Sequence, residues 1–317
     1  MLISVIIAIY SEKRLPTLMK AIKNHLNQSY KDKEIIIVVD NNEKVFNFLR
    51  RQKIPEIKIY LNTKDRGLSV ARNMGINVSK GEIITFIDDD AIPHKLWLEK
   101  LAEKYQIEGI HAVGGMIKPM WVEIPWLPEE LYWTIGCIYK GYPVGSNLRV
   151  RNVIGCNMSF RREALKKVGN FKRGLGRVGT NLIGGEETNI CMRIIDYYGS
   201  QSVYFAPDAL VWHVVESNRR NLPFFFRRAF SEGITKAWTN QFKKKNIDSK
   251  NNQPEMKFQN VERTYLHFLL NKAIPLRLKQ LYSPLKISQL FLLVMSIFFV
   301  GLGYFYGHII LDKTLDQ

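Results

Sequence analysis

Three apolar runs in the first 90 residues constrain the fold of this chain more than any other feature. They read SVIIAIY, EIIIVVD and EIITFID, and segments with helical spacing of apolar residues lie between them. Strands that are apolar on both faces are typical of a parallel sheet that helices cover on both sides. The sequence therefore predicts an α/β fold with a mostly parallel sheet flanked by helices.

Polar residues follow each of these runs at the point where the strand is expected to end. In chain order they are Tyr10, Asp40, Asn41 and the triplet Asp88, Asp89 and Asp90. Ligands of parallel sheets bind beyond the carboxyl ends of the strands. We therefore expect these side chains to lie along one rim of the sheet, where they would form a binding site.

The three adjacent aspartates need a compensating charge. Neighbouring carboxylates disfavour one another's ionisation unless a cation lies between them. Two carboxylates two residues apart at the end of a strand can face one divalent cation, and Mg²⁺ or Mn²⁺ would keep open positions for phosphate oxygens. An acidic turn, with Asp90 capping a helix in PHKLWLEKL, is the alternative.

A second acidic pair, Glu186 and Glu187, stands in GGEET ahead of a helical pattern. A carboxylate at this place can deprotonate an attacking hydroxyl as a general base. It can also simply favour the positive end of a helix dipole. From the residues alone both interpretations stay open.

The formal net charge of +17 calls for an anionic partner or surface. Between Asn218 and Lys286 there are 15 Lys and Arg against 4 Asp and Glu, so this stretch carries +11 of the total. Apolar residues are interleaved with the charge, which is typical of segments that lie against anionic lipid headgroups. A solvated basic face is the alternative, and no nucleic-acid motif accompanies the charge, so no nucleic-acid partner is expected.

The stretch from Ile287 to Leu311 contains no Asp, Glu, Lys or Arg. As a helix it would reach roughly 37 Å, enough to cross a hydrocarbon core of about 30 Å. The sequence predicts one transmembrane helix here, with a buried core helix as the alternative. By the positive-inside rule we expect a single-pass protein of the cell membrane, with a cytoplasmic main body and only the tail Asp312 to Gln317 beyond the bilayer.

The N-terminus and the cysteines agree with a cytoplasmic body. The run Leu2 to Tyr10 is short and lacks a basic leader, so it predicts a strand rather than a signal peptide. Cys137, Cys156 and Cys191 are far apart and odd in number, which fits a reducing compartment.

Seven motifs in a fixed order carry a resemblance to a known family. They are SVIIAIY, EIIIVVD, RGLSVARNMGI, ITFIDDDAIP, GCNMSFRREALKKVGNF, GGEETNICMRI and PDALVWH. Together they resemble the family 2 inverting glycosyltransferases of the Rossmann-like GT-A fold. The resemblance implies a catalytic domain at 1–215, with a nucleotide-binding half at 1–108 and an acceptor half at 109–215. A basic amphipathic segment at 216–286 and the membrane helix at 287–311 would follow.

The resemblance also implies roles for particular residues. A nucleotide-sugar donor would lie near Tyr10, Asp40 and Asn41, and Arg72 would approach it. Asp88 and Asp90 match the metal-binding DxD pair, while Asp89 would lie nearer the ribose or the sugar. His213 stands where many relatives bring a histidine towards the metal or diphosphate, although a structural histidine is nearly as good an interpretation.

The base and the nucleotide specificity depart from the family pattern. Glu187 stands where relatives have the Asp of a GGED-like motif, so it is the expected catalytic base, with Glu186 as a competitor. Ala8 and Asn41 replace a Thr and an Asp of some relatives. These two departures weaken any expectation that the nucleobase of the donor is uracil.

The expected reaction is metal-dependent transfer of a sugar to a membrane lipid-linked glycan on a polyprenyl or dolichyl phosphate, for surface glycoproteins or polysaccharides. The acceptor phosphate would meet four arginines that precede the apolar helix: Arg219, Arg220, Arg227 and Arg228. The alternative is a membrane-tethered glycan-binding module on a catalytically inactive transferase fold.

Overall fold

The computed structural model describes residues 1–120, 126–173, 175–176, 184–247 and 261–315. These residues form two compact units. Unit 1 comprises the described residues within Met1–Met120, Ser146–Asn181 and Glu186–Val214, and unit 2 those within Trp121–Gly145, Leu182–Gly185 and Val215–Gln317.

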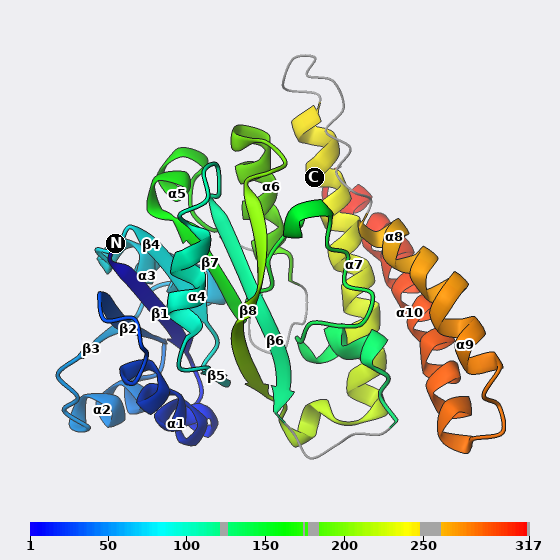
Figure 1. The fold of residues 1–317 in the computed structure, drawn as a ribbon, viewed down its shortest axis with the longest axis horizontal. Coiled ribbons are helices and arrows are strands. Elements are labelled where there is room, and N and C mark those ends of the chain that lie inside the picture. The colour runs from blue at the N-terminus through cyan, green and yellow to red at the C-terminus, as the bar shows by residue number, and fades with distance from the viewer. Residues whose placement is uncertain (121–125, 174, 177–183, 248–260, 316–317) are drawn as a thin grey trace. The chain divides into compact units, whose positions relative to one another are not determined.

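Unit 1 is built on one eight-stranded sheet with the order β3-β2-β1-β4-β7-β6-β8-β5 (Figure 1). The strands are β1 (Ile3–Ile9), β2 (Lys33–Asp40), β3 (Ile57–Asn62), β4 (Ile83–Ile87), β5 (Ala91–Pro93), β6 (Ala112–Met120), β7 (Asn157–Arg161) and β8 (Val203–Val214). The first four strands are parallel, and β6 is parallel to β8. Antiparallel pairing joins β7 to β4 and β6, and β5 to β8. The predicted mostly parallel α/β sheet is confirmed.

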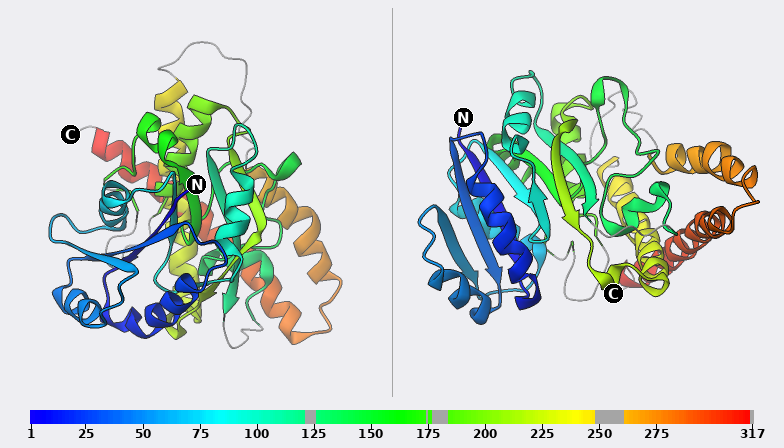
Figure 2. Two further views of the ribbon diagram at one scale, coloured as in Figure 1. Left: turned by 60° about the vertical axis from the view of Figure 1, so that its left-hand side comes forward. Right: turned by 60° about the horizontal axis from the view of Figure 1, so that its bottom comes forward.

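The helices of unit 1 cover this sheet. They are α1 (Leu15–Leu26), α2 (Glu43–Arg51), α3 (Leu68–Val78), α4 (Trp97–Lys104), α5 (Arg162–Val168) and α6 (Glu186–Tyr198), with short helices η1 (Glu12–Arg14) and η3 (Ser146–Leu148). Helix α3 packs on β1 and β2, α1 lies against β5, and α4 lies against β8 (Figure 2). Because helices cover the sheet, every residue of β4 and most residues of β1 and β2 are buried.

Local sequence signals set several helix ends. The Asn42 side chain accepts a hydrogen bond from the Val45 N–H at 3.1 Å and caps α2. Pro16 lies in the first turn of α1, where its missing N–H costs nothing. These ends place the residues that follow β1 and β2 at the carboxyl edge of the sheet.

Unit 2 is helical. Its elements are η2 (Glu129–Ile135), η4 (Ser217–Arg219), α7 (Leu222–Ile247), α8 (Val261–Phe268), the π-helical turn η5 (Leu269–Ala273), α9 (Ile274–Leu278) and α10 (Pro284–Leu315). A buried ion pair joins η2 to α9, with the Arg277 guanidinium donating to both carboxylate oxygens of Glu130 at 3.1 and 2.7 Å. The Tyr265 hydroxyl from α8 donates to the Glu130 carbonyl.

The predicted apolar helix is present as α10. Within the part of the chain that the structure describes, one helix, over Pro284–Ile310, is long and apolar enough to cross a membrane. Only 22% of its most apolar stretch is buried, which argues against the core helix of a soluble domain.

One buried amide ties three strands and a helix of unit 1 together. Asn157 on β7 accepts from the Trp97 indole N–H at 2.9 Å and donates to the carbonyls of Met116 and Ala209 at 3.1 and 2.9 Å. The side chain is fully buried. Removing it would leave an N–H and two carbonyls without these partners.

We expect Asn157→Ala to lower the free energy of unfolding by about 2–4 kcal/mol, because each orphaned buried polar group costs about 1–3 kcal/mol. Denaturant unfolding of the full chain would measure the change. Asn24→Ala is the control, since that exposed amide bonds only the Lys20 carbonyl. Equal stability of the two variants would contradict the bridging role.

Candidate active site

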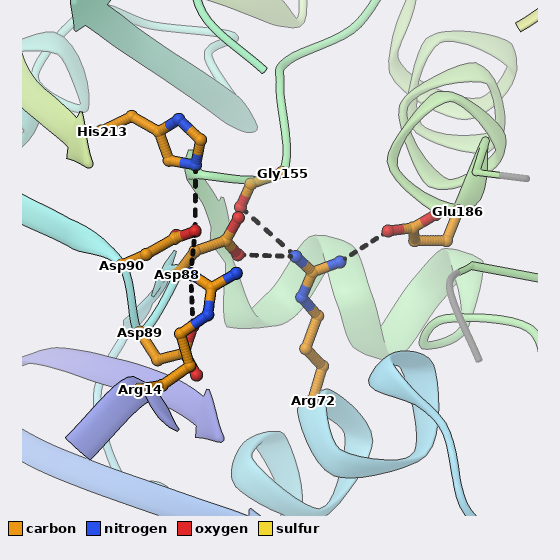
Figure 3. Close-up of polar contacts among 8 residues, drawn as sticks. All are labelled: Arg14, Arg72, Asp88, Asp89, Asp90, Gly155, Glu186 and His213. Carbon is orange, nitrogen blue, oxygen red and sulfur yellow. Dashed lines mark hydrogen bonds and ion pairs between the residues drawn. The ribbon is translucent and has the colours of Figure 1, made fainter. Parts of the chain in front are cut away.

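The acidic triplet lies directly after β4, at the carboxyl end of a buried strand. The chain turns back at once, with the Ala91 N–H donating to the Asp88 carbonyl at 3.1 Å, and continues as β5. Asp89 and Asp90 are buried, while Asp88 is partly exposed. The three carboxylates therefore point to different surroundings, as Figure 3 shows.

Asp90 is compensated by a histidine and an arginine. Ala91 pairs with His213 across the β5–β8 ladder, which brings His213 Nε2 to 3.2 Å from the Asp90 carboxylate. The Arg14 guanidinium also contacts the Asp90 carboxylate, and the same nitrogen lies 3.8 Å from Asp89. A protein cation thus sits on two of the three aspartates.

Asp88 is joined to the second acidic pair through Arg72 on α3. One guanidinium nitrogen lies 3.4 Å from both Asp88 Oδ1 and the Gly155 carbonyl, and the other donates to Glu186 at 2.9 Å. Arg72 is only 3% exposed. Its guanidinium also lies over the rings of Phe86 and Phe171, at 5.9 and 5.5 Å from the ring centroids, so its position is fixed from all sides.

The acidic pair at the start of α6 has two different environments. Glu186 is buried and paired with Arg72. Burial and the neighbouring Glu186 raise the pKa of Glu187 to about 8. The two adjacent carboxyls are therefore suited to different tasks, one as a fixed charge and the other as a proton acceptor.

The ends of β1 and β2 supply a second polar cluster. The Asp40 carboxylate accepts from the Asn62 amide at 2.7 Å and from the Gly67 N–H at 3.0 Å. Asn41 has a left-handed backbone, with φ of 52°, and its side chain donates to the Lys64 carbonyl. Tyr10 is 58% exposed, so its ring is open to a ligand.

The structure brings most of the predicted residues together. Contacts link Asp88 to Arg72 and Glu186, and link Asp90 to His213. Glu187 follows Glu186 on α6, and Tyr10, Asp40 and Asn41 lie at neighbouring strand ends.

The sequence prediction missed two site residues. Arg14 was missed because the stretch SEKR looks like an exposed charged turn. The structure shows that Arg14 is buried just after the end of β1. Gly155 contributes a backbone carbonyl, which no side-chain motif can reveal.

The four arginines predicted for an acceptor phosphate belong to unit 2. Arg228 is already paired with Glu232 at 3.0 Å. Burial opposes ionisation of Glu232, but Lys236 and Arg228 outweigh it and hold the pKa of that carboxyl at about 2. Arg228 is therefore already committed in part to a carboxylate of its own helix.

The donors of the triplet fit a divalent cation by type but do not yet form a complete site. Carboxylate oxygens are the ligands that Mg²⁺ and Mn²⁺ prefer, and His213 adds a nitrogen beside Asp90. Among the described residues no three His, Cys, Asp or Glu side chains make up a metal-binding group. Arg14 supplies positive charge at Asp90 instead.

We expect Arg72→Met to destabilise the fold by about 3–5 kcal/mol, because it leaves Glu186 as a buried charge without this partner. Adding Glu186→Gln should restore part of the loss. Arg173→Met is the control, since Arg173 and Asp65 form an exposed pair, which contributes about 0–1 kcal/mol. Denaturant unfolding measures all three, and equal losses for Arg72→Met and Arg173→Met would refute the buried-pair account.

Comparison with solved structures identifies the fold. A mannosyltransferase, PcManGT from Pyrobaculum calidifontis, solved with GDP-Man and Mn²⁺, superposes with a TM-score of 0.62 over 96% of this chain and 87% of its own, at 16% identity. GalNAc-T7, solved with UDP, GalNAc and Mn²⁺, gives a TM-score of 0.54 over 87% of this chain and 57% of its own, also at 16% identity. The chain has the GT-A fold.

Sequence comparison identifies the family. A glucosyl-dolichyl phosphate glucuronosyltransferase of Haloferax volcanii is 30% identical over 97% of this chain and 96% of its own length. The succinoglycan biosynthesis protein ExoM of Rhizobium meliloti is 28% identical over 58% of this chain and 57% of its own. The family model described as "Glycosyl transferase family 2" matches residues 4–169, and the chain belongs to that family of glycosyltransferases.

Proposed function

We propose that this glycosyltransferase moves a sugar, with inversion, from a nucleotide-sugar donor to a glycan on a polyprenyl or dolichyl phosphate, at the cytoplasmic face of the cell membrane. The products would serve surface glycoproteins or polysaccharides. One observation carries the proposal: Arg72 links the acidic triplet after β4 to the acidic pair that begins α6. The acidic triplet would bind the donor and the acidic pair would supply the catalytic base, on the two sides of the Arg72 guanidinium.

The nucleotide would bind at the ends of β1 and β2. The exposed Tyr10 ring offers a face on which a base can stack. Asp40 is held by Asn62 and Gly67, so its carboxylate is a fixed acceptor for hydroxyl or N–H donors of the nucleoside. Asp89 would lie nearer the ribose or the sugar, and Arg72 would approach the donor.

Asp88, Asp90 and His213 would hold a divalent cation, Mn²⁺ or Mg²⁺. Both solved structures of similar fold contain Mn²⁺. When bound, such a cation supplies positive charge that stabilises the departing diphosphate. The Arg14 guanidinium contacts the Asp90 carboxylate, so Arg14 and the cation would have to share that carboxylate, or Arg14 would have to move away from it.

Glu187 would act as the general base. Its raised pKa favours it as a proton acceptor, whereas Glu186 is paired with the Arg72 guanidinium. The acceptor hydroxyl gives its proton to Glu187 as its oxygen forms a bond to the anomeric carbon. The bond from that carbon to the diphosphate breaks on the opposite face, so the configuration inverts.

The lipid-linked acceptor is supported by the basic segment at 216–286 and by the Haloferax relative, whose name refers to dolichyl phosphate. Arg219, Arg220, Arg227 and Arg228 are the arginines of this segment proposed to bind the acceptor phosphate, and Arg228 would have to share its guanidinium with Glu232. The anionic cytoplasmic leaflet would attract the same positive charge, which supports a cytoplasmic catalytic unit.

We expect purified protein to release nucleoside diphosphate from one member of a panel of UDP-, GDP- and dTDP-sugars, with Mn²⁺ or Mg²⁺ and a polyprenyl phosphate-linked acceptor. Chelation should abolish release.

Asp88→Asn should lower kcat/KM roughly 100-fold or more and weaken Mn²⁺ binding measured by electron paramagnetic resonance. Asp208→Asn, an exposed aspartate on β8, is the control. Donor binding without release across the panel would favour the inactive glycan-binding module.

We expect Glu187→Gln to abolish transfer while donor binding persists, with Glu163→Gln, at an exposed glutamate of α5, as the control. Because the base must be ionised, wild-type kcat/KM should rise about tenfold per pH unit below about 7 and level off above about pH 8. Initial rates across pH would measure this. If Glu187→Gln turned over normally and Glu186→Gln did not, the base would be Glu186.

A further inference from the structure

Helix α10 packs backbone to backbone against α7. A Cβ added at Gly303 would collide with the Phe230 carbonyl, and one added at Gly233 would collide with the Val300 carbonyl. Gly307 sits against Ile234 and Ala237 in the same way. Figure 1 shows the two helices, drawn in yellow and red, alongside each other. Close approach through small residues makes α7 and α10 one rigid element.

The stretch of α7 that contacts α10 is charged. Arg228 and Lys236 both pair with Glu232, at 3.0 and 3.2 Å, and Lys236 also lies 3.5 Å from Glu262 on α8. The pairs of Glu232 fall between Phe226 and Ala237, the same turns that meet α10. With Arg227, these turns of α7 carry four charged residues, which a lipid-facing helix would not have.

The opposite side of α10 is an apolar stripe of seven residues, each 43–70% exposed. The stripe comprises Ile287, Phe291, Val294, Phe298, Leu302, Phe305 and Ile309. Their spacing of three and four residues places them on one helix face. Leu292, Leu293 and Ser296 are buried in unit 2, so α10 is two-sided, with protein on one side and an uncovered apolar face on the other.

A transmembrane orientation conflicts with this packing. The candidate span Pro284–Ile310 has Ile297 at its middle. Val300 and Gly307, which touch α7, would lie about 5 and 15 Å from the bilayer midplane, at about 1.5 Å per residue. That is within the hydrocarbon half-thickness of about 15 Å, so the charged turns of α7 would be drawn into the hydrocarbon.

We propose that α10 lies in the plane of an anionic bilayer, with the stripe immersed and α7 on the water side, in place of the crossing that composition alone predicts. Although α10 is apolar along most of its length, unit 2 covers its other side, so the helix presents one apolar face that can be buried at a headgroup boundary. Leu278, Leu281 and Tyr282 next to α10 are also exposed, and the exposed Lys279 among them would meet anionic headgroups. This inference rests on the membrane association in the proposed function.

Topology separates this arrangement from a crossing. Full-length protein carrying different epitope tags at its two ends would be prepared in sealed inside-out membrane vesicles and treated with protease. We expect both tags to be cut from the outside while the protein stays with the membrane. Protection of the C-terminal tag alone would establish a crossing and overturn the inference. Protein found wholly in the soluble fraction would instead overturn the membrane association itself.

A stripe variant tests the surface. Phe298→Glu with Phe305→Glu should reduce flotation with vesicles of 30% phosphatidylglycerol in phosphatidylcholine at least tenfold, with an unchanged melting temperature, because both side chains are exposed. Phe48→Glu, exposed on α2, is the matched control and should float like wild type. Unchanged flotation of the stripe variant would overturn the proposal. The proposal would also be overturned if the wild-type protein formed a dimer that the stripe variant dissociates, while the stripe variant still floated with vesicles. The stripe would then bind a second copy of the chain.

Discussion

Compensation of buried negative charge is the constraint on which the rest of the site depends. Asp89, Asp90 and Glu186 are buried near the carboxyl edge of the sheet, beside the partly exposed Asp88, and burial disfavours the charged form of a carboxylate unless an opposite charge lies nearby. Arg72 and Arg14 supply the opposing charge from α3 and from the turn after β1. Their guanidinium groups let the protein fold with several carboxylates close together before any ligand arrives.

Local sequence patterns predicted the features that repeat along the chain. The apolar strands, the polar residues at their ends and the long apolar helix follow from period and composition, and the structure contains each of them. The pairing of β5 with β8 could not be predicted from local sequence patterns. A three-residue strand pairs with one more than a hundred residues away, and that pairing is what brings His213 to Asp90.

Side chains that act over long sequence separations were harder to anticipate. Arg14 and Asp90 are 76 residues apart, and Glu130 and Arg277 are 147 apart. The described residues of Trp121–Gly145 group with the C-terminal helices, whereas the sequence interpretation placed 109–215 in one acceptor half. No local pattern shows that this segment groups with the C-terminal helices, because the residues that it packs against lie far away in the sequence. The domain boundaries drawn from the sequence remain a prediction.

The enclosure of Arg72 has a consequence for the ionic conditions under which the protein works. Dissolved salt screens charges that water can reach, with a Debye length of about 8 Å at physiological ionic strength, and it screens buried pairs far less. Arg72 and Glu186 are both nearly inaccessible to solvent, whereas Arg173 and Asp65 are open to it. As ionic strength rises, attraction within the surface pair fades, while the alignment of the Arg72 guanidinium with Glu186 persists. The geometry of this buried pair therefore depends little on the concentration of dissolved salt.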